Sequence, residues 1–195
     1  MPRAGLTPPR VVAEAAAVAD EVGLERLTLA AVAARLGVTL PSLYKHVRGA
    51  EGLRRDLSVR ALDELTVELS RASVGTAGRD ALQAVTHAYR RYAQRHPGLI
   101  AATLQAPDPH DATHVTAATH TLDVLTSTLR EYRLDEERQI DAIRSLRAVL
   151  HGFVSLEAAG GFGLPQSVEE TFERLVDGLD LLFTSWGTAT STDSP

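Results

Sequence analysis

Hydrophobic side chains recur along most of this 195-residue chain at the three- and four-residue spacing of amphipathic α-helices. Glycine, proline and small polar residues separate the periodic segments, and no useful length of chain alternates apolar and polar residues as a β-strand does. The longest helices are therefore predicted over about residues 11–22, 51–70, 79–95, 115–132, 136–159 and 167–186, with residues 73–78 as a turn. Together with shorter segments, this pattern predicts an all-α protein of about nine helices.

Two short apolar segments near the N-terminus predict a pair of helices joined by a tight turn. Thr28 can cap a helix over residues 29–36, and Gly37 can end it, because glycine enters the left-handed conformation at little steric cost. Thr39 is then a second cap, in front of a helix over about residues 40–46. With the helix that precedes them, these segments predict a three-helix head.

The second helix of the pair has an outer edge suited to contact DNA. Leu43 and Val47 form its apolar side, so the remaining side chains face outward. Residues at its start are candidates for contacts with base edges in a major groove, and Tyr44 and Lys45 for contacts with phosphates. With a basic arm at the N-terminus, the expected DNA-binding residues are Arg3, Thr28, Thr39, Leu40, Pro41, Ser42, Tyr44, Lys45, His46 and Arg48.

This segment resembles the N-terminal domain of the TetR-type transcriptional regulators. That family commonly carries Gly-Val-(Ser/Thr)-x-x-(Ser/Thr)-Leu-Tyr-x-His-Phe, and this chain reads Gly37-Val38-Thr39-Leu40-Pro41-Ser42-Leu43-Tyr44-Lys45-His46-Val47. Val47 replaces the usual aromatic residue. Arg48-Gly49-Ala50-Glu51 replaces the usual loop, in which a lysine before the glutamate often contacts a phosphate, and Arg48 is the candidate substitute.

The C-terminal half is similar to the TetR-family domain variety named for a Trp-His-Gly motif. The resemblance rests on the run His151-Gly152-Phe153-Val154-Ser155-Leu156-Glu157-Ala158-Ala159-Gly160-Gly161-Phe162, although the only tryptophan is Trp186. It implies a ligand-responsive regulator, expected to be a repressor, that binds a double-stranded, pseudo-palindromic operator as a homodimer and is released by a small-molecule effector. The alternatives are a helical enzyme that binds a metal or small molecule, and a structural helical protein that senses nothing.

The distribution of charge favours DNA binding by the head. The chain has a net charge of −5, but residues 1–60 carry a net +3 and residues 61–195 a net −8. Positive charge is therefore concentrated where a head would contact phosphates.

The absence of cysteine excludes thiol chemistry, disulfides and cysteine metal sites. With no segment that predicts a membrane span or a secretory signal, we expect a cytoplasmic protein. The resemblance to the TetR-type regulators implies that it is not an enzyme.

Aromatic and leucine side chains of the C-terminal half suggest where an effector and a second copy would bind. Aromatic residues on helix faces fill a core as readily as they line a cavity. The candidate ligand-binding residues are Tyr89, Tyr92, His120, His151, Phe153 and Phe162. The last two long helices are more apolar than a small bundle needs, so the candidate dimer residues are Leu150, Leu175, Leu179, Leu182 and Trp186.

Three histidines are the only hint of a metal site in the sequence. His110 and His114 can share one helical face, but His120 falls roughly opposite, and two ligands are too few for a structural zinc ion. We expect no metal and no cofactor. The glycine-rich residues 160–163 follow a helix rather than a strand, so they predict a turn and not a phosphate-binding loop.

The expected domains are a DNA-binding domain over residues 1–47 and a ligand-binding and dimerisation domain over residues 48–187. Residues 48–70 are expected to form a linking helix at the start of the second domain. Residues 188–195, rich in serine and threonine, are expected to form a flexible tail.

Overall fold

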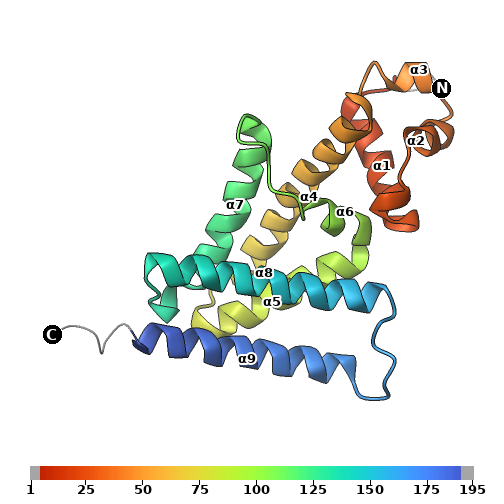
Figure 1. The fold of residues 1–195 in the computed structure, drawn as a ribbon. Helices are drawn as coiled ribbons and strands as arrows, with labels where there is room; N and C mark the ends of the chain where they lie inside the picture. Colours follow the sequence, from red (N-terminus) through yellow and green to blue (C-terminus); the bar gives the residue numbers. More distant parts are fainter. Residues whose placement is uncertain (1–4, 190–195) are drawn as a thin grey trace. The chain divides into compact units, whose positions relative to one another are not determined.

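The computed structural model describes residues 5–189, which form α-helices, two short 3₁₀ helices and loops (Figure 1). Across this range there is no strand, so the all-α prediction is confirmed. The helices are α1 (Pro8–Val22), η1 (Leu24–Arg26), α2 (Leu29–Leu36), α3 (Leu40–Leu43), α4 (Gly49–Ser73), α5 (Gly78–Arg95), α6 (Pro97–Ala102), α7 (Ala112–Thr128), η2 (Arg130–Tyr132), α8 (Glu136–Ala158) and α9 (Val168–Ala189).

The chain divides into two compact units. Of the described residues, unit 1 comprises 5–64 and 95–118, and unit 2 comprises 65–94 and 119–189. This division places the first part of α4, all of α6 and the first turns of α7 with the N-terminal helices, whereas the sequence suggested a boundary at residue 47. The predicted Arg3 contact lies outside the described residues, as do residues 190–195 of the predicted tail.

Unit 1 is built on the apolar face of α1. Pro8 and Pro9 occupy the first turn of α1, where a missing N–H costs nothing, and Gly23 ends the helix with φ +88°. The face of α1 toward the core carries only valine and alanine, which lets other helices approach closely. The buried core of unit 1 comprises Val11, Ala15, Ala16, Val18, Ala19, Leu27, Val32, Ala33, Leu43, Val47, Leu53, Leu57, Ala61, Leu99 and Ala102.

The short helix α6, which we did not predict from the sequence, packs directly against α1. Gly98 lies so close to α1 that a Cβ atom there would come within 2.3 Å of the backbone of Ala19. The Asp20 carboxylate accepts hydrogen bonds from the backbone N–H groups of Gly98, at 2.9 Å, and Leu99, at 3.2 Å. Its other oxygen lies 3.0 Å from Nδ1 of His96. A side chain of α1 therefore caps the start of α6.

Unit 2 contains the two long C-terminal helices, which run alongside each other in opposite directions (Figure 1). The Asp135 side chain caps α8 by accepting from the N–H of Arg138 at 2.8 Å. The Ser167 hydroxyl accepts from the N–H of Glu170 at 3.2 Å, which caps the start of α9. Helix α9 continues through Ala189, so its last two residues are helical where the sequence suggested a tail.

Candidate nucleic-acid interface

The reversal between α2 and α3 has two of the three predicted caps, at Thr28 and Gly37. The Thr28 hydroxyl accepts a hydrogen bond from the N–H of Ala31 at 3.1 Å, which caps α2. Gly37 follows the helix in the left-handed conformation, with φ 66° and ψ 33°, and Val38 then donates to the carbonyl of Ala33 at 3.0 Å. These bonds fix the direction in which the chain enters α3.

Helix α3 is shorter than the sequence predicted. It ends at Leu43, and the segment that follows is a turn rather than helix to His46. His46 donates to Leu43 at 2.9 Å, an i to i+3 bond that tightens the turn, and Val47 is buried with 5% exposure. Thr39 occupies the N-cap position, but its hydroxyl makes no capping bond, which corrects that detail of the prediction.

Eight of the ten expected DNA-binding residues fall within residues 39–48, the segment that forms α3 and the turn after it. Leu43 is fully buried, whereas Leu40 and Tyr44 are 37% and 55% exposed. Thr39, Pro41, Lys45 and Arg48 are exposed, Ser42 and His46 are partly buried, and the cap residue Thr28 is exposed in front of α2. This surface offers hydroxyls and cations that can bind phosphates, beside a short helix that can face base edges.

Ion pairs between Arg35 of α2 and two glutamates of α1 join these helices. The Arg35 guanidinium contacts Glu14 at 2.6 Å from Nε, and it also pairs with Glu21 from Nη1. Hydrogen bonding to Glu21 is the main cause that raises the pKa of Arg35. These pairs are exposed, so we expect their contribution to be orientation of α2 rather than much stability.

A buried polar contact joins α4 to α7 within unit 1. Ser58 Oγ lies 2.9 Å from Nε2 of His114, and both side chains are almost fully buried. Beside them, Arg55 donates from Nε and Nη2 to both carboxylate oxygens of Asp111, each at 2.5 Å. Bonding to Arg55 holds the pKa of the Asp111 carboxyl far below its usual range. A pocket of about 680 Å³ opens next to this ion pair, with His46 and Arg48 also in its wall.

The burial of His114 should make the stability of the protein depend on pH. Burial lowers the pKa of His114, although Asp111 opposes this shift. Below the unfolded value of about 6.5 the unfolded chain binds a proton that the folded chain resists, so stability present above that pH is lost as pH falls. His114→Gln should lose less stability between pH 7.5 and 5.5 than the wild type, by up to about 1.4 kcal/mol per pH unit.

Thermal unfolding followed by circular dichroism across this pH range measures the difference. His110→Gln is the matched control, because His110 is an exposed histidine of the same segment. Burial also lowers the pKa of His151. The His114→Gln variant should therefore still lose some stability as the pH falls, although less than the wild type. If the stability of wild type and His114→Gln changed identically with pH, buried His114 would not be the cause of the loss at low pH.

In unit 2 four of the candidate ligand-binding residues form two contacting pairs. The Tyr89 hydroxyl lies 3.4 Å from Nδ1 of His151, and burial raises the pKa of Tyr89 to about 12. The Phe153 and Phe162 rings are 4.9 Å apart. Tyr92 is almost fully buried, with 1% exposure. His120 is exposed on the described part of α7 and does not share in these contacts.

Two of the candidate dimer residues are buried inside unit 2 itself. Leu150 is 1% exposed and Leu179 is 5% exposed, so neither supplies surface to a second copy. This burial removes both from the proposed dimer surface. Leu175 and Trp186 are partly buried, and Leu182 is 37% exposed.

The structure also shows a histidine beside two acidic side chains. Among the described residues, the group able to offer three such ligand atoms is His87, Glu169 and Glu173, and it includes none of the histidines 110, 114 and 120. His87 stands on α5, and both glutamates stand on α9. Sequence reasoning missed this group because 82 residues separate His87 from Glu169. Within the described range, no helix has the length and apolar character to cross a membrane.

Comparisons with known proteins agree with this geometry. Residues 11–57 match the family described as bacterial regulatory proteins of the tetR family, and residues 82–179 match the tetracyclin repressor-like C-terminal domain. The uncharacterized HTH-type transcriptional regulator Rv0681 of Mycobacterium tuberculosis is 35% identical over 88% of this chain and 81% of its own length. The uncharacterized HTH-type transcriptional regulator YobS of Bacillus subtilis is 34% identical over 93% of this chain and 89% of its own length.

Solved structures share the fold at lower identity. Apo ActR from Streptomyces coelicolor superimposes with a TM-score of 0.72 at 17% identity, covering 96% of this chain and 99% of that one. A variant of TetR from Acinetobacter baumannii AYE, solved in complex with minocycline, gives a TM-score of 0.70 at 22% identity and covers 92% of this chain and 97% of that one. With its capped helix-turn-helix and its matches over both halves, the chain belongs to the TetR family of helix-turn-helix transcriptional regulators.

Proposed function

We propose that this regulator is a repressor that binds a pseudo-palindromic operator as a homodimer and is released by a small-molecule effector. The observation that carries the proposal is the exposed surface of residues 39–48 on a helix-turn-helix whose core side chains are buried. One relative, the HTH-type transcriptional repressor DrrR1 of Streptomyces coeruleorubidus, is 36% identical over 107 residues, which favours repression. The minocycline complex of the Acinetobacter relative favours control by a small molecule.

In this proposal each head reads one half of the operator. Thr39, Leu40, Pro41 and Ser42 face base edges, while Tyr44, Lys45 and Arg48 contact phosphates. Two heads that enter successive major grooves on one side of the duplex lie about 34 to 36 Å apart, or a multiple of that distance. The effector acts by favouring a state of the dimer in which this spacing is lost.

The dimer surface that we propose is formed by exposed apolar positions on α8 and α9. Leu156, Leu181 and Leu182 are 53%, 71% and 37% exposed. Gly152 in α8 and Gly178 in α9 are exposed helix-interior glycines, and a Cβ atom at either position would meet, beyond its chain neighbours and the backbone of its own helix, no described atom within 4 Å. Such glycines cost about 1 kcal/mol each relative to alanine, and they allow a second helix to approach closely. A second copy packed here completes a four-helix bundle.

Leu181→Glu should convert the dimer to monomers. The symmetry of the interface places two buried carboxylates in the apolar contact, which should raise the dissociation constant of the dimer by at least about 100-fold. Sedimentation velocity measures the change, and Leu104→Glu is the control, because Leu104 is an exposed leucine, 55% exposed, in unit 1. A fully dimeric Leu181→Glu variant would contradict the proposed surface.

For the effector, the candidate residues are the partly or fully buried Tyr89, Tyr92, His151, Phe153 and Phe162. Two pairs among them are in contact, Tyr89 with His151 through polar atoms and Phe153 with Phe162 through their rings, and such groups can contact the polar and flat parts of a ligand. This choice leaves out the exposed His120.

Native mass spectrometry with DNA from the upstream region of its own gene tests the proposed function. The expected complex holds two chains, or a multiple of two, for each duplex, and an effector carried through purification adds mass to the free dimer. A complex with one chain per duplex, or no binding above that of a scrambled duplex, would overturn the proposal.

A further inference from the structure

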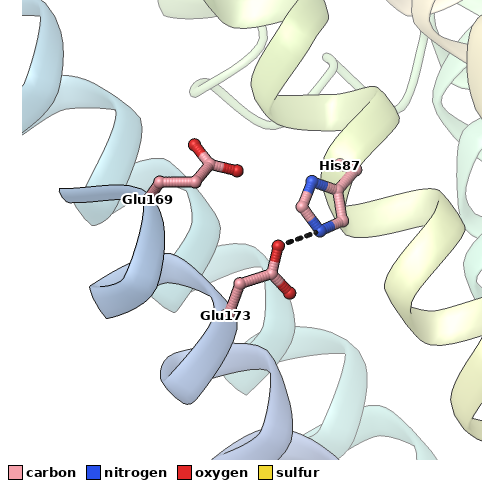
Figure 2. A group of neighbouring side chains, drawn as sticks. All are labelled: His87, Glu169 and Glu173. Carbon is pink, nitrogen blue, oxygen red and sulfur yellow. Dashed lines mark ion pairs between the residues drawn. The ribbon is translucent and has the colours of Figure 1, made fainter. Parts of the chain in front are cut away.

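The face of unit 2 between α5 and α9 carries a compact group of metal-ligating atoms (Figure 2). His87 projects from α5, and Glu169 and Glu173 project toward it from successive turns of α9. Their ligand atoms all lie within 4.8 Å of one another, and Nε2 of His87 is 3.0 Å from a carboxylate oxygen of Glu173. We propose that these three side chains bind a divalent transition-metal ion, with Zn²⁺ as the reference ion.

The distances fit an ion after one small movement. In a tetrahedral zinc site with bonds of about 2.0 to 2.2 Å, neighbouring ligand atoms are roughly 3.3 to 3.5 Å apart. His87 and Glu173 are already near this separation, at 3.0 Å. Only Glu169 has to approach, which requires it to give up or share its 2.6 Å ion pair with Arg90, and its side chain is 62% exposed and so has room to change rotamer. A fourth position is left for water or another ligand.

Neighbouring side chains orient two of the three ligands. The Gln83 amide lies 3.3 Å from the second carboxylate oxygen of Glu173, so the first oxygen is directed at His87. The Phe172 ring packs edge-on against the His87 imidazole, with centroids 5.2 Å apart. Partners of this kind fix the rotamers of metal ligands in proteins.

The local charge also suits a divalent cation. Arg90 is buried, and it donates from Nε and Nη2 to both oxygens of Glu157, at 3.1 and 2.6 Å. Its Nη1 also contacts Glu169 at 2.6 Å. With a neutral imidazole, the three glutamates and one arginine leave a net charge of −2 beside His87. A divalent ion balances this charge, while Glu157 continues to pair with Arg90.

The ligand types select the class of ion. One imidazole nitrogen with two carboxylates suits Zn²⁺, Ni²⁺ or Co²⁺, whereas Mg²⁺ and Ca²⁺ prefer oxygen alone. A bound ion would join α5 to α9, two helices far apart in the sequence. The proposal revises the expectation from the sequence that no metal binds, and it stands independently of the proposed operator and effector.

The test is zinc binding by the full-length protein, measured by calorimetry and by the rise in melting temperature that a bound ion causes. The wild type should bind about one zinc ion per chain at this site and be stabilised by it. His87→Ala and Glu173→Gln should each weaken binding by more than about 100-fold, and Gln83→Ala by about tenfold or more. Cobalt should give the visible absorption bands of a four-coordinate ion in the wild type, and these should be lost in the variants.

Two controls separate this site from scattered surface binding. Glu170→Gln removes an exposed carboxylate of the same helix, and His120→Ala removes an exposed histidine, so both should bind zinc like the wild type. Glu173→Gln keeps the shape of the side chain, so it remains informative if His87→Ala fails to fold. Equal zinc affinity in wild type and Glu173→Gln, or no saturable binding by the wild type, would overturn the site. Unchanged zinc affinity in Glu169→Gln would show that Glu169 is not a ligand, which would overturn a site made of all three residues.

Discussion

Alanine at both Tyr44 and Lys45 is expected to weaken operator binding by about 1000-fold. Tyr44 is 55% exposed and Lys45 is exposed beside it, so neither substitution removes core packing. Each head would lose two phosphate contacts, and at about 1 kcal/mol for each of the four contacts in a dimer the loss is about 4 kcal/mol. Fluorescence anisotropy with a labelled operator duplex measures it.

The salt dependence and two controls identify the cause of that loss. Without Lys45, the slope of log affinity against log salt should become shallower by about 1 for each head. Tyr44→Phe keeps the ring and removes only the hydroxyl, so it should show part of the effect. Arg91→Ala removes one exposed cation outside the head and should change affinity little. An unaltered affinity in the double variant would refute the proposed phosphate contacts.

Gly98→Ala should be the most damaging single-methyl change in unit 1. The added Cβ atom would lie 2.3 Å from the backbone carbon and oxygen of Ala19, and a backbone cannot move aside as a flexible side chain does. Such overpacking costs about 3 kcal/mol, which corresponds to a fall in melting temperature of about 6 to 12 °C for a chain of this size. Thermal unfolding followed by circular dichroism measures the shift.

A second substitution shows whether the backbone contact is responsible. Ala19→Gly removes only the Ala19 Cβ atom, at 2.7 Å from the added atom, and leaves the closer backbone atoms in place. It should therefore fail to rescue Gly98→Ala. Gly163→Ala is the control, because a Cβ atom there meets nothing within 4 Å. A melting temperature of Gly98→Ala equal to that of the control would show that α6 is not packed as described.

Local chemistry explains which parts of the head could be predicted from sequence. Thr28 and Gly37 act through their own backbone neighbours, so their identity was sufficient to place the ends of α2. Helix α6 was missed because its proline and glycine were interpreted, like the others, only as a break between periodic segments. Pro97 in fact opens α6, and the capping carboxylate comes from Asp20 on another helix. No local pattern reveals such a distant cap.

In unit 2, periodicity identified the apolar faces of α8 and α9 but not what covers them. Leu150 and Leu179 have the same spacing as an interface residue would have, yet they are buried within the chain. Leu181, which is exposed, was overlooked because periodicity does not tell which apolar positions remain uncovered. His87 and Glu173 meet only because α5 and α9 pack together, and a single sequence carries no signal for that contact.

The carboxylate of Asp20 makes the backbone of α6 a reporter on α1. The N–H groups of Gly98 and Leu99 belong to the first turn of a helix, where amide protons normally exchange with water quickly because they have no partner within the helix. Here both are bonded to a side chain of another helix. Their exchange rates are therefore set by how often α1 and α6 separate, and hydrogen exchange at these two amides would follow that separation in the intact protein.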